Sequence, residues 1–304
     1  FRAAFGLWRS GDSEATPWLG AYVTDFLLRA QQSGIAVPRA PMEQAYTALR
    51  KVARLNDFGG VGYDDRVYQW PGNNDTSDLL RSRSAAYALY VLAKARQADI
   101  GQVRYYFDTH VANGSEPSPL ARAQIGAALY FLGDRARGHA AFQAAERALG
   151  YRNLGDWYQT PLRDLSGVLA LAAEAGEIDM VNRLRVRLER DAPDPDNMMT
   201  QEQVQLLLAA NALLQRSGDV NVTQNGRPMA GRSIVATARN LATGLVFQNN
   251  ARGPVWRSMM RAGAPLTAPP AMSGGYTLSK EIYRLDGSRA DLNSIRQGDR
   301  VVVV

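Results

Sequence analysis

The fold is decided by the stretch SRSAAYALYVLAKA at residues 82–95, in which alanine, leucine and tyrosine recur as in a helix that buries most of its surface. Four more segments have the same character: residues 18–30 (WLGAYVTDFLLRA), 120–133 (LARAQIGAALYFLG), 162–176 (LRDLSGVLALAAEAG) and 201–214 (QEQVQLLLAANALL). The starts at 18, 82, 120, 162 and 201 are 64, 38, 42 and 39 residues apart. This rhythm, with more polar helical stretches in between, predicts stacked helical hairpins.

The composition is that of a soluble, folded protein. Of the 304 residues, 46% are hydrophobic and 21% are charged, and the chain is long enough for two domains with a sizeable core. No apolar run approaches the roughly 18 residues that span a bilayer, and the start does not resemble a signal peptide. The net charge of +6 is scattered along helices, which indicates a solvated surface and no nucleic-acid partner.

The chemistry available to these residues is limited. The sequence contains no cysteine, which excludes disulfides, thiolate catalysis and cysteine-based zinc sites within it. Its two histidines, His110 and His139, lie in helical stretches without a second type of metal ligand at suitable spacing. We interpret both as ordinary surface or partly buried residues.

The other polar residues form no recognisable catalytic pattern. The acidic pair Asp64–Asp65 and the stretch 191–197 lack a basic partner in sequence and do not match the EF-hand pattern, so we interpret them as solvated loop acids. Gln69–Trp70 resembles a triterpene cyclase repeat but occurs once, and Tyr46, Trp70 and Trp157 are candidates to line a groove. The sequence therefore predicts no catalytic, cofactor-binding or metal-binding residue, and no cofactor.

Three arginines have matched positions near the starts of repeating helices: Arg83, Arg122 and Arg163. We expect them to form buried ion pairs or caps with carboxylates such as Asp164 or Glu202. Because the same residue type recurs at one level of the stack, a structural use is favoured over a catalytic one.

Local signals mark the first two helices. Thr16 before a proline predicts an N-cap and a helix over about 17–32. Pro38 and Pro41 predict the turn into a second helix over about 42–55. The two helices therefore form the first hairpin of the stack.

The helical pattern ends near residue 217. Thr200 and Gln203 match the capping-box pattern at the start of the last helix. From Gly218 the apolar period changes from 3.6 to 2, and Asn225–Gly226 predicts a hairpin turn. Strands are predicted at 219–226, 232–238, 244–250, 254–263, 276–287 and 300–304.

Two stretches interrupt these elements. Residues 56–77 are rich in glycine and asparagine and predict a long ordered loop or hairpin, and residues 265–275 predict a linker between two β pieces. The sequence looks truncated at both ends. Phe1 lies inside a sequence pattern that has already begun, and the apolar strand at 301–304 is followed by nothing that could pair with it. We expect the sequence to be part of a longer chain.

The order of these segments carries a family resemblance. FGLW at 5–8, followed by PWLGAYVTDFLLRA at 17–30, resembles the loop and helix of the thioester domain in the alpha-2-macroglobulin and complement superfamily. The bacterial branch is more similar still. It matches through residues 83–95, 120–134, 162–176, 199–214, 220–231, 276–287 and 297–304. The resemblance covers essentially the whole chain.

The resemblance implies a mainly α fold with a C-terminal β part. Residues 1–217 correspond to an α/α toroid of helical hairpins, the first of which is missing upstream. Residues 218–270 correspond to the second half of a CUB-like β-sandwich, and residues 271–304 to the start of the terminal macroglobulin-like β domain. Strands of a half-sandwich need partners for their backbone groups, so the family implies that this part does not fold fully alone.

One departure from the family bears on chemistry. Thioester-bearing members carry a Cys-x-Glu-Gln motif in the hairpin before this region, and these residues contain no cysteine. The histidine that assists transfer in some eukaryotic relatives is expected soon after the first helix pair, whereas the first histidine here is His110. The resemblance thus leaves open whether a thioester is present.

The resemblance implies a protease trap and not an enzyme. In this family a protease cuts a bait segment, the molecule rearranges around it, and thioester-bearing members link to it covalently. We expect target proteases, the upstream domains and other envelope proteins as partners. The expected setting is the periplasm, with the full-length lipoprotein anchored to the inner membrane upstream, in broad-spectrum cell-envelope defence. Residues 56–77 and 265–275 are candidates for surfaces that remake contacts.

Two alternatives stay open. The first is a thioester-less scaffold or interaction protein of the periplasm. The second is an enzyme built on an α/α toroid, such as a cyclase or a glycoside-processing protein. It needs paired carboxylates at the mouth of the toroid, for which Asp64, Asp65 and Asp164 are the entrants.

Overall fold

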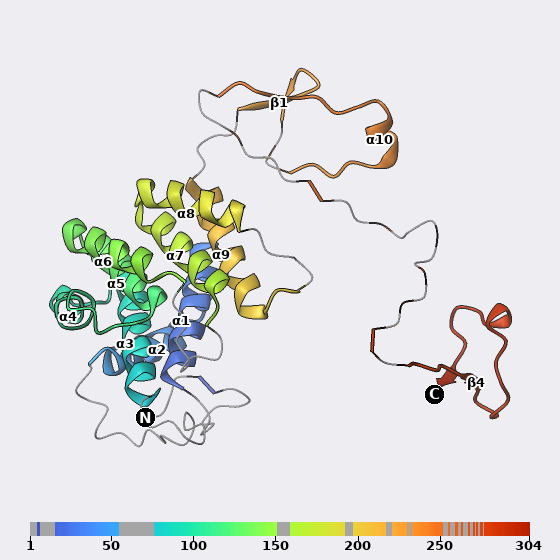
Figure 1. Ribbon diagram of the computed structural model, residues 1–304, viewed down its shortest axis with the longest axis horizontal. Helices are drawn as coiled ribbons and strands as arrows, with labels where there is room; N and C mark the ends of the chain where they lie inside the picture. Colours follow the sequence, from blue (N-terminus) through green and yellow to red (C-terminus); the bar gives the residue numbers. More distant parts are fainter. Residues whose placement is uncertain are drawn as a thin grey trace. The chain divides into compact units, whose positions relative to one another are not determined.

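The computed structural model describes residues 5–6, 16–54, 76–150, 159–191, 197–216, 221–229, 233–251 and 277–304, with isolated positions between 231 and 275. The chain divides into two compact units, Phe1–Val220 and Asn221–Val304 (Figure 1). We call the first the helical unit and the second the strand unit. The predicted fold class, mainly α with a C-terminal β part, is confirmed.

The helical unit is a series of helical hairpins. Its described helices are α1 (Pro17–Gln32), α2 (Arg39–Val52), α3 (Thr76–Lys94), α4 (Ile100–Tyr106), the π-helix η3 (Phe107–Val111), α5 (Pro119–Phe131), α6 (Arg135–Ala148), α7 (Pro161–Ala175), α8 (Ile178–Arg190) and α9 (Thr200–Arg216). The odd-numbered helices carry the five alanine-rich segments and pack in succession, α1 on α3, α3 on α5, α5 on α7 and α7 on α9. We call these five the inner helices, and we call α2, α4, α6 and α8, which pack against them, the outer helices (Figure 1).

Three inner helices begin with a hydroxyl-bearing residue followed by proline. The pairs are Thr16–Pro17, Ser118–Pro119 and Thr160–Pro161, at the starts of α1, α5 and α7. Each hydroxyl oxygen accepts the backbone N–H three residues further on, at 3.0, 3.2 and 3.1 Å respectively. Proline is tolerated at the first helical position because the N–H that it lacks has no acceptor within the helix. The predicted start and end of α1 are confirmed.

The second helix begins earlier than the sequence predicted. It starts at Arg39 with Pro38 as its N-cap, so Pro41 lies inside its first turn and not before it. A proline is accepted there because first-turn amides need no helical partner. The helix ends at Val52, a few residues short of the predicted 55.

The capping box predicted at Thr200 and Gln203 is also wrong in register. Thr200 is already helical, and the side chain of Glu202 accepts the backbone N–H of Met199 at 2.8 Å. Gln203 instead donates to the carbonyl of Met198 at 3.0 Å. The cap is shifted because a carboxylate is a stronger acceptor for an amide than the neutral Gln203 side chain.

Helices α5 and α6 approach closely at two glycines. A Cβ on Gly138 would lie 2.4 Å from the ring of Tyr130, and one on Gly126 would lie 3.0 Å from the ring of Phe142. The two rings meet edge to face with centroids 5.8 Å apart. The absence of both Cβ atoms therefore sets the distance between this inner helix and its outer partner.

The strand unit contains two small antiparallel sheets among its described residues. One has the order β2-β1-β3, built from β1 (Val222–Gln224), β2 (Arg227–Pro228) and β3 (Phe247–Asn249). The other pairs β4 (Ile282–Arg284) with β5 (Val301–Val303). The hairpin turn predicted at Asn225–Gly226 joins β1 to β2, with φ of +49° and +78° at these residues.

Several predicted strands are shorter than expected or missing. Residues 233–237, which belong to the predicted strand 232–238, form no strand, and a short helix, α10 (Ala238–Ala242), begins at the last residue of that prediction. The prediction was wrong because a run of β-branched residues forms a strand only when a neighbour offers backbone partners. Most of 254–263 and 56–77 lies outside the described residues. The CUB-like and macroglobulin-like assignments of 218–270 and 271–304, like the toroid boundary at 217, stay predictions.

None of the described helices combines the length and the apolar character that a membrane span requires.

We predict that Gly138→Ala destabilises the protein although alanine is the better helix former. The new methyl group meets the Tyr130 ring and the backbone oxygen of Gly126, and overpacking of this kind costs about 1–3 kcal/mol. Gly20→Ala in α1 is the matched control, because a Cβ there meets nothing within 4 Å. That control should stabilise by about 0.5–1 kcal/mol. Urea unfolding followed by circular dichroism measures both, and equal effects of the two changes would contradict the close approach.

Candidate functional site

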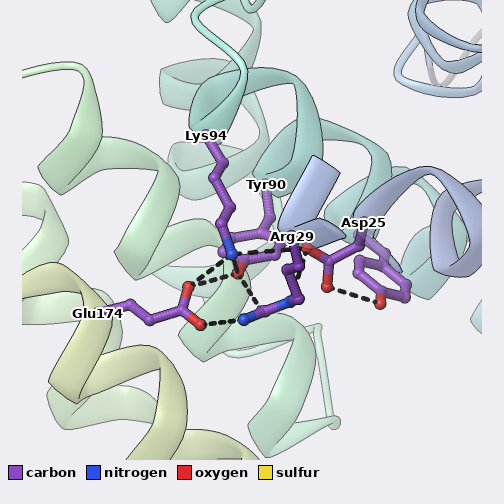
Figure 2. A network of polar contacts seen from close by, with 6 residues as sticks. Asp25, Arg29, Tyr90, Lys94 and Glu174 are labelled. Carbon is purple, nitrogen blue, oxygen red and sulfur yellow. Dashed lines mark hydrogen bonds and ion pairs between the residues drawn. The ribbon is translucent and has the colours of Figure 1, made fainter. Parts of the chain in front are cut away.

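A buried polar network lies where α1, α3 and α7 meet (Figure 2). We call it the central network, and it consists of Asp25, Arg29, Tyr87, Tyr90, Lys94 and Glu174. Arg29 is in the last turn of α1, Lys94 is the last residue of α3, and Glu174 is next to the end of α7. These three inner helices therefore end at the same side of the helical unit.

Glu174 is the acceptor at one end of the network. Arg29 donates to its Oε1 at 2.6 Å, and Lys94 Nζ donates to its Oε2 at 3.0 Å. The hydroxyl of Tyr90 donates to the same Oε2 at 2.7 Å. One carboxylate thus ties α7 to both α1 and α3.

Asp25 is the acceptor at the other end. It receives Nε of Arg29 at 3.1 Å and the hydroxyl of Tyr87 at 3.2 Å, and Lys94 Nζ lies 3.6 Å away. Arg29 also donates to the hydroxyl oxygen of Tyr90 at 2.9 Å. Each cation therefore contacts both carboxylates, and the two positive and two negative charges balance.

The network is buried, with only 5% of the Asp25 side chain and 9% of the Lys94 side chain exposed. Charges removed from water to this extent are tolerated only when they are paired and hydrogen-bonded. Arg29 and Lys94 are also close to helix C-termini, where the partial negative charge of the helix dipole favours a cation. Location and pairing together offset the cost of burying these charges.

The pKa values of Glu174, Arg29 and Tyr90 indicate whether these groups exchange protons near neutral pH. Burial by itself raises the pKa of Glu174, but Arg29 and Lys94 outweigh it and hold that pKa below its usual 4.5. Burial alone lowers the pKa of Arg29, and the oxygens of Tyr90, Asp25 and Glu174 reverse this and raise it. Burial raises the pKa of Tyr90 well above 10. None of these three groups is poised to exchange a proton near neutral pH, so the arrangement fastens helices and does not suit acid–base catalysis.

A second polar layer lies at the opposite ends of the inner helices. Arg163 forms a buried ion pair with Asp164 at 2.8 Å, as the sequence predicted. Thr160, the cap of α7, donates to Glu202 at 2.5 Å and so ties α7 to α9. Arg122 binds backbone carbonyls, at 2.5 Å for that of Glu116 and 3.0 Å in α6, where a carboxylate partner was expected. Arg83 is buried in α3.

Glu116 is a buried carboxylate that sequence reasoning missed. Its oxygens accept from the hydroxyls of Ser82 at 2.5 Å and Tyr106 at 2.8 Å, and from the backbone N–H of Ser118 at 2.9 Å. It thereby joins the loop before α5 to α3 and α4. Like the central network, this cluster holds helices together.

Of the two histidines, His110 is partly buried and His139 is exposed, in line with the interpretation as surface or partly buried residues. His110 lies in the π-helix, with its ring centroid 4.9 Å from that of Tyr106. His139 is half exposed and lies 2.9 Å from Glu177, which also accepts the hydroxyl of Tyr130. Burial, together with Glu177, raises the pKa of Tyr130 to about 12. Within the described residues, no three potential metal ligands gather.

The remaining candidates separate into two groups. Tyr46 is buried in the core, and Asp191 pairs with Arg190 at 3.2 Å on the surface. Asp64–Asp65, Gln69–Trp70 and Trp157 lie outside the described residues. The central network contains no candidate from this list. Its signal in the sequence was a set of single charges placed within alanine-rich apolar helices.

Comparison with known proteins shows which protein family the chain is related to. No family model matches the chain. A curated alpha-2-macroglobulin of Xylella fastidiosa is 30% identical over 319 aligned residues, which take in 98% of this chain and 18% of the relative. A crystal structure of Salmonella alpha-2-macroglobulin reacted with methylamine matches 99% of the chain and 19% of its own, with 27% identity and a TM-score of 0.59. The chain belongs to the bacterial alpha-2-macroglobulin family.

A second solved relative extends the comparison within the family. The crystal structure of trypsin-activated alpha-2-macroglobulin from Escherichia coli matches 99% of this chain and 20% of its own, with 27% identity and a TM-score of 0.55. The family resemblance drawn from the residues is therefore confirmed. The chain spans about a fifth of the length of the alpha-2-macroglobulins that it matches.

We predict that Glu174→Gln destabilises the helical unit by about 3 kcal/mol, because the buried cations Arg29 and Lys94 are left to share one carboxylate, that of Asp25. Glu146→Gln is the matched control. It removes the carboxylate that Arg183 binds at 2.8 Å between two outer helices, where both side chains are more exposed. That pair should be worth less than about 1 kcal/mol. The two variants are compared by their midpoints of urea unfolding. An equal loss of stability in both would show that the central network stabilises the fold no more than a surface ion pair does.

The lowered pKa of Glu174 predicts that the stability of the protein depends on pH. The folded state lowers the pKa of Glu174 from 4.5, so its contribution to the free energy of unfolding is fully present above pH 4.5. It is lost as the pH falls through the lower folded value. The difference in stability between the natural protein and Glu174→Gln should therefore shrink below pH 4.5. A difference that stays constant down to pH 3 would mean that Glu174 is not ionised in the fold.

Proposed function

We propose that the chain is part of a bacterial protease inhibitor of the alpha-2-macroglobulin type, which traps a protease after the protease cuts its bait segment. The observation that carries the proposal is the similarity of the chain, over 98–99% of its residues, to bacterial alpha-2-macroglobulins. One of these relatives is described as trypsin-activated and another as reacted with methylamine. A protease and a small amine thus act on relatives that include the counterpart of this chain.

The role proposed for the helical unit is that of a rigid body within a rearranging molecule. A switch of this kind needs modules that keep their internal packing while their contacts with other domains change. The central network supports that role because it joins α1, α3 and α7 through residues up to 145 positions apart in sequence. The two carboxylates of the central network, Asp25 and Glu174, are occupied by structural partners, which supports a non-catalytic part.

Exposed apolar side chains on the first and last described helices of the helical unit indicate that another part of the same protein packs there. Trp18 and Phe26 on α1 are exposed, as are Leu207 and Leu214 on α9. Large apolar side chains on a terminal helix of a repeat stack need a neighbouring repeat or a cap. We propose that an upstream hairpin covers them, as the family resemblance implies.

The proposed setting is the periplasm, in broad-spectrum defence of the cell envelope. Target proteases and the preceding domains of the same protein are the proposed partners, with other envelope proteins as further ones. A lipid anchor upstream of these residues would tie the protein to the inner membrane. Nucleic acid is not a proposed partner, because two arginines of the outer helices, Arg183 and Arg137, form ion pairs with Glu146 and Asp108.

The proposal predicts a selective loss of protease activity. The protein, in the length that its source cell produces, is mixed with elastase and assayed on a small peptide and on a bulky protein substrate. A trap leaves cleavage of the peptide intact and suppresses cleavage of the protein substrate, because the enclosed protease still admits small molecules. Protein incubated with methylamine beforehand serves as the control for a thioester. Equal activity on both substrates, without cleavage of the inhibitor, would refute trapping and favour the thioester-less scaffold.

A further inference from the structure

Four inner helices, α1, α3, α5 and α7, end in the same backbone motif. The chain turns through a residue in the left-handed region, and two backbone hydrogen bonds close over the last turn of the helix, as in a Schellman motif. After α3 these bonds run from the N–H of Arg96 to the carbonyl of Ala93 at 3.0 Å and from the N–H of Gln97 to the carbonyl of Leu92 at 2.7 Å. The left-handed residue of this helix end is therefore Arg96.

Glycine is the residue that this left-handed position favours. It occupies the position after α1, α5 and α7, as Gly34, Gly133 and Gly176, with φ of +84°, +89° and +92°. After α3 the same position holds Arg96, with φ of +57°. Among the described residues, the other non-glycine residue with positive φ is Asn225, in a hairpin turn where asparagine is tolerated. A residue with a Cβ costs free energy in this conformation, so the structure keeps an arginine where glycine is less strained.

The helix dipole by itself does not require an arginine at this position. A cation near a helix C-terminus is favourable, but it can be placed in the last helical turn, where the backbone is not strained. Lys94 already has that place in α3, and Arg29 has it in α1, where glycine follows at the left-handed position. A strained residue that persists where a less strained one would serve is typical of a position whose side chain makes a functional contact.

The turn between α3 and α4, residues 95–99, carries positive charge without a matching carboxylate. Arg96 is exposed, and its guanidinium forms no ion pair or hydrogen bond with the part of the chain that the structure describes. A second cation lies beside it, because Arg50 of α2 donates to the side chain of Gln97. The acid of this turn, Asp99, accepts the backbone N–H of Gly101 at 2.8 Å and caps α4. Two cations therefore meet at this turn, and no described carboxylate pairs with either.

We propose that the turn at residues 95–99 is a recognition site for a carboxylate, which Arg96 binds and which an Asp or Glu side chain of another domain of the same protein supplies. A guanidinium offers a carboxylate two parallel N–H donors, whereas glycine at this position offers no side chain. Arg50 adds to the attraction from the same turn. The alpha-2-macroglobulins that the chain matches extend well beyond it, since it spans about a fifth of their length, and their further domains are the expected source of the carboxylate.

Such a contact joins a neighbouring domain to the helical unit close to the central network. Arg96 is two residues after Lys94, which ties the end of α3 to α1 and α7. An ion pair at the surface is weak and is screened by salt, so it can form and break when domains change their contacts. The inference rests on the part of the proposed function that gives this protein further domains. It does not rest on protease trapping, so the two proposals can fail separately.

The first experiment is photo-crosslinking from position 96. Arg96 is replaced by p-benzoylphenylalanine in the protein of the length that its source cell produces, and the crosslinked peptides are identified by mass spectrometry. We expect a crosslink to a segment that contains Asp or Glu and lies outside these 304 residues. The same probe in place of Arg190, an exposed arginine at the end of α8, is the matched control and should not reach that segment. No crosslink from position 96, or one to a segment without an acidic residue, would overturn the proposal.

Two substitutions separate carboxylate binding from a purely local role of the arginine. Arg96→Lys keeps the backbone strain and the charge at the helix end but loses the paired donors of the guanidinium. We expect it to lower the thermal midpoint by about 1–3 °C at low salt, and we expect this loss to disappear at high salt. Arg96→Gly removes both the strain and the charge. A higher midpoint for Arg96→Gly at low and high salt, with Arg96→Lys unchanged, would show that Arg96 binds no carboxylate and would overturn the proposal.

Discussion

The helical unit depends on one constraint, which is that four charged side chains buried among its inner helices must meet one another. Asp25, Arg29, Lys94 and Glu174 come from helices that are distant in sequence, and each loses most of its hydration on folding. Any arrangement that leaves one of them unpaired costs several kcal/mol. The positions of α1, α3 and α7 are therefore coupled to each other through this pairing. The outer helices then pack on an inner layer whose geometry is already set.

The pattern along the chain was sufficient to predict the inner helices and their order. Alanine-rich segments about forty residues apart leave few alternatives to stacked hairpins, and the Thr16–Pro17 signal located the start of α1. The Asn225–Gly226 turn was likewise local, since it needs only two residues that tolerate positive φ. The exact starts of α2 and α9 were missed because proline and acidic residues are compatible with more than one register at a helix N-terminus.

The central network could not be derived from local patterns. Arg29 and Glu174 are separated by 145 positions, and nothing in a single sequence states which of many arginines meets which carboxylate. Strand prediction in the strand unit was partly wrong for a related reason. Residues 233–237 have the composition of a strand, but β-propensity reports a fit to neighbours and does not provide them. In both cases the missing information is the identity of a distant partner.

Between alanine-rich helices, this long-range pairing contributes more to specifying the helix register than to the net free energy of folding. Small side chains present smooth surfaces, and a slip of one turn, about 5.4 Å, exchanges one alanine-lined contact for a similar one. Such a slip would carry Glu174 away from Arg29 and Lys94, which it contacts at 2.6 and 3.0 Å. Buried ion pairs add little stability over apolar replacements, but they penalise every alternative register. The network thus specifies one arrangement of helices whose apolar faces would permit several.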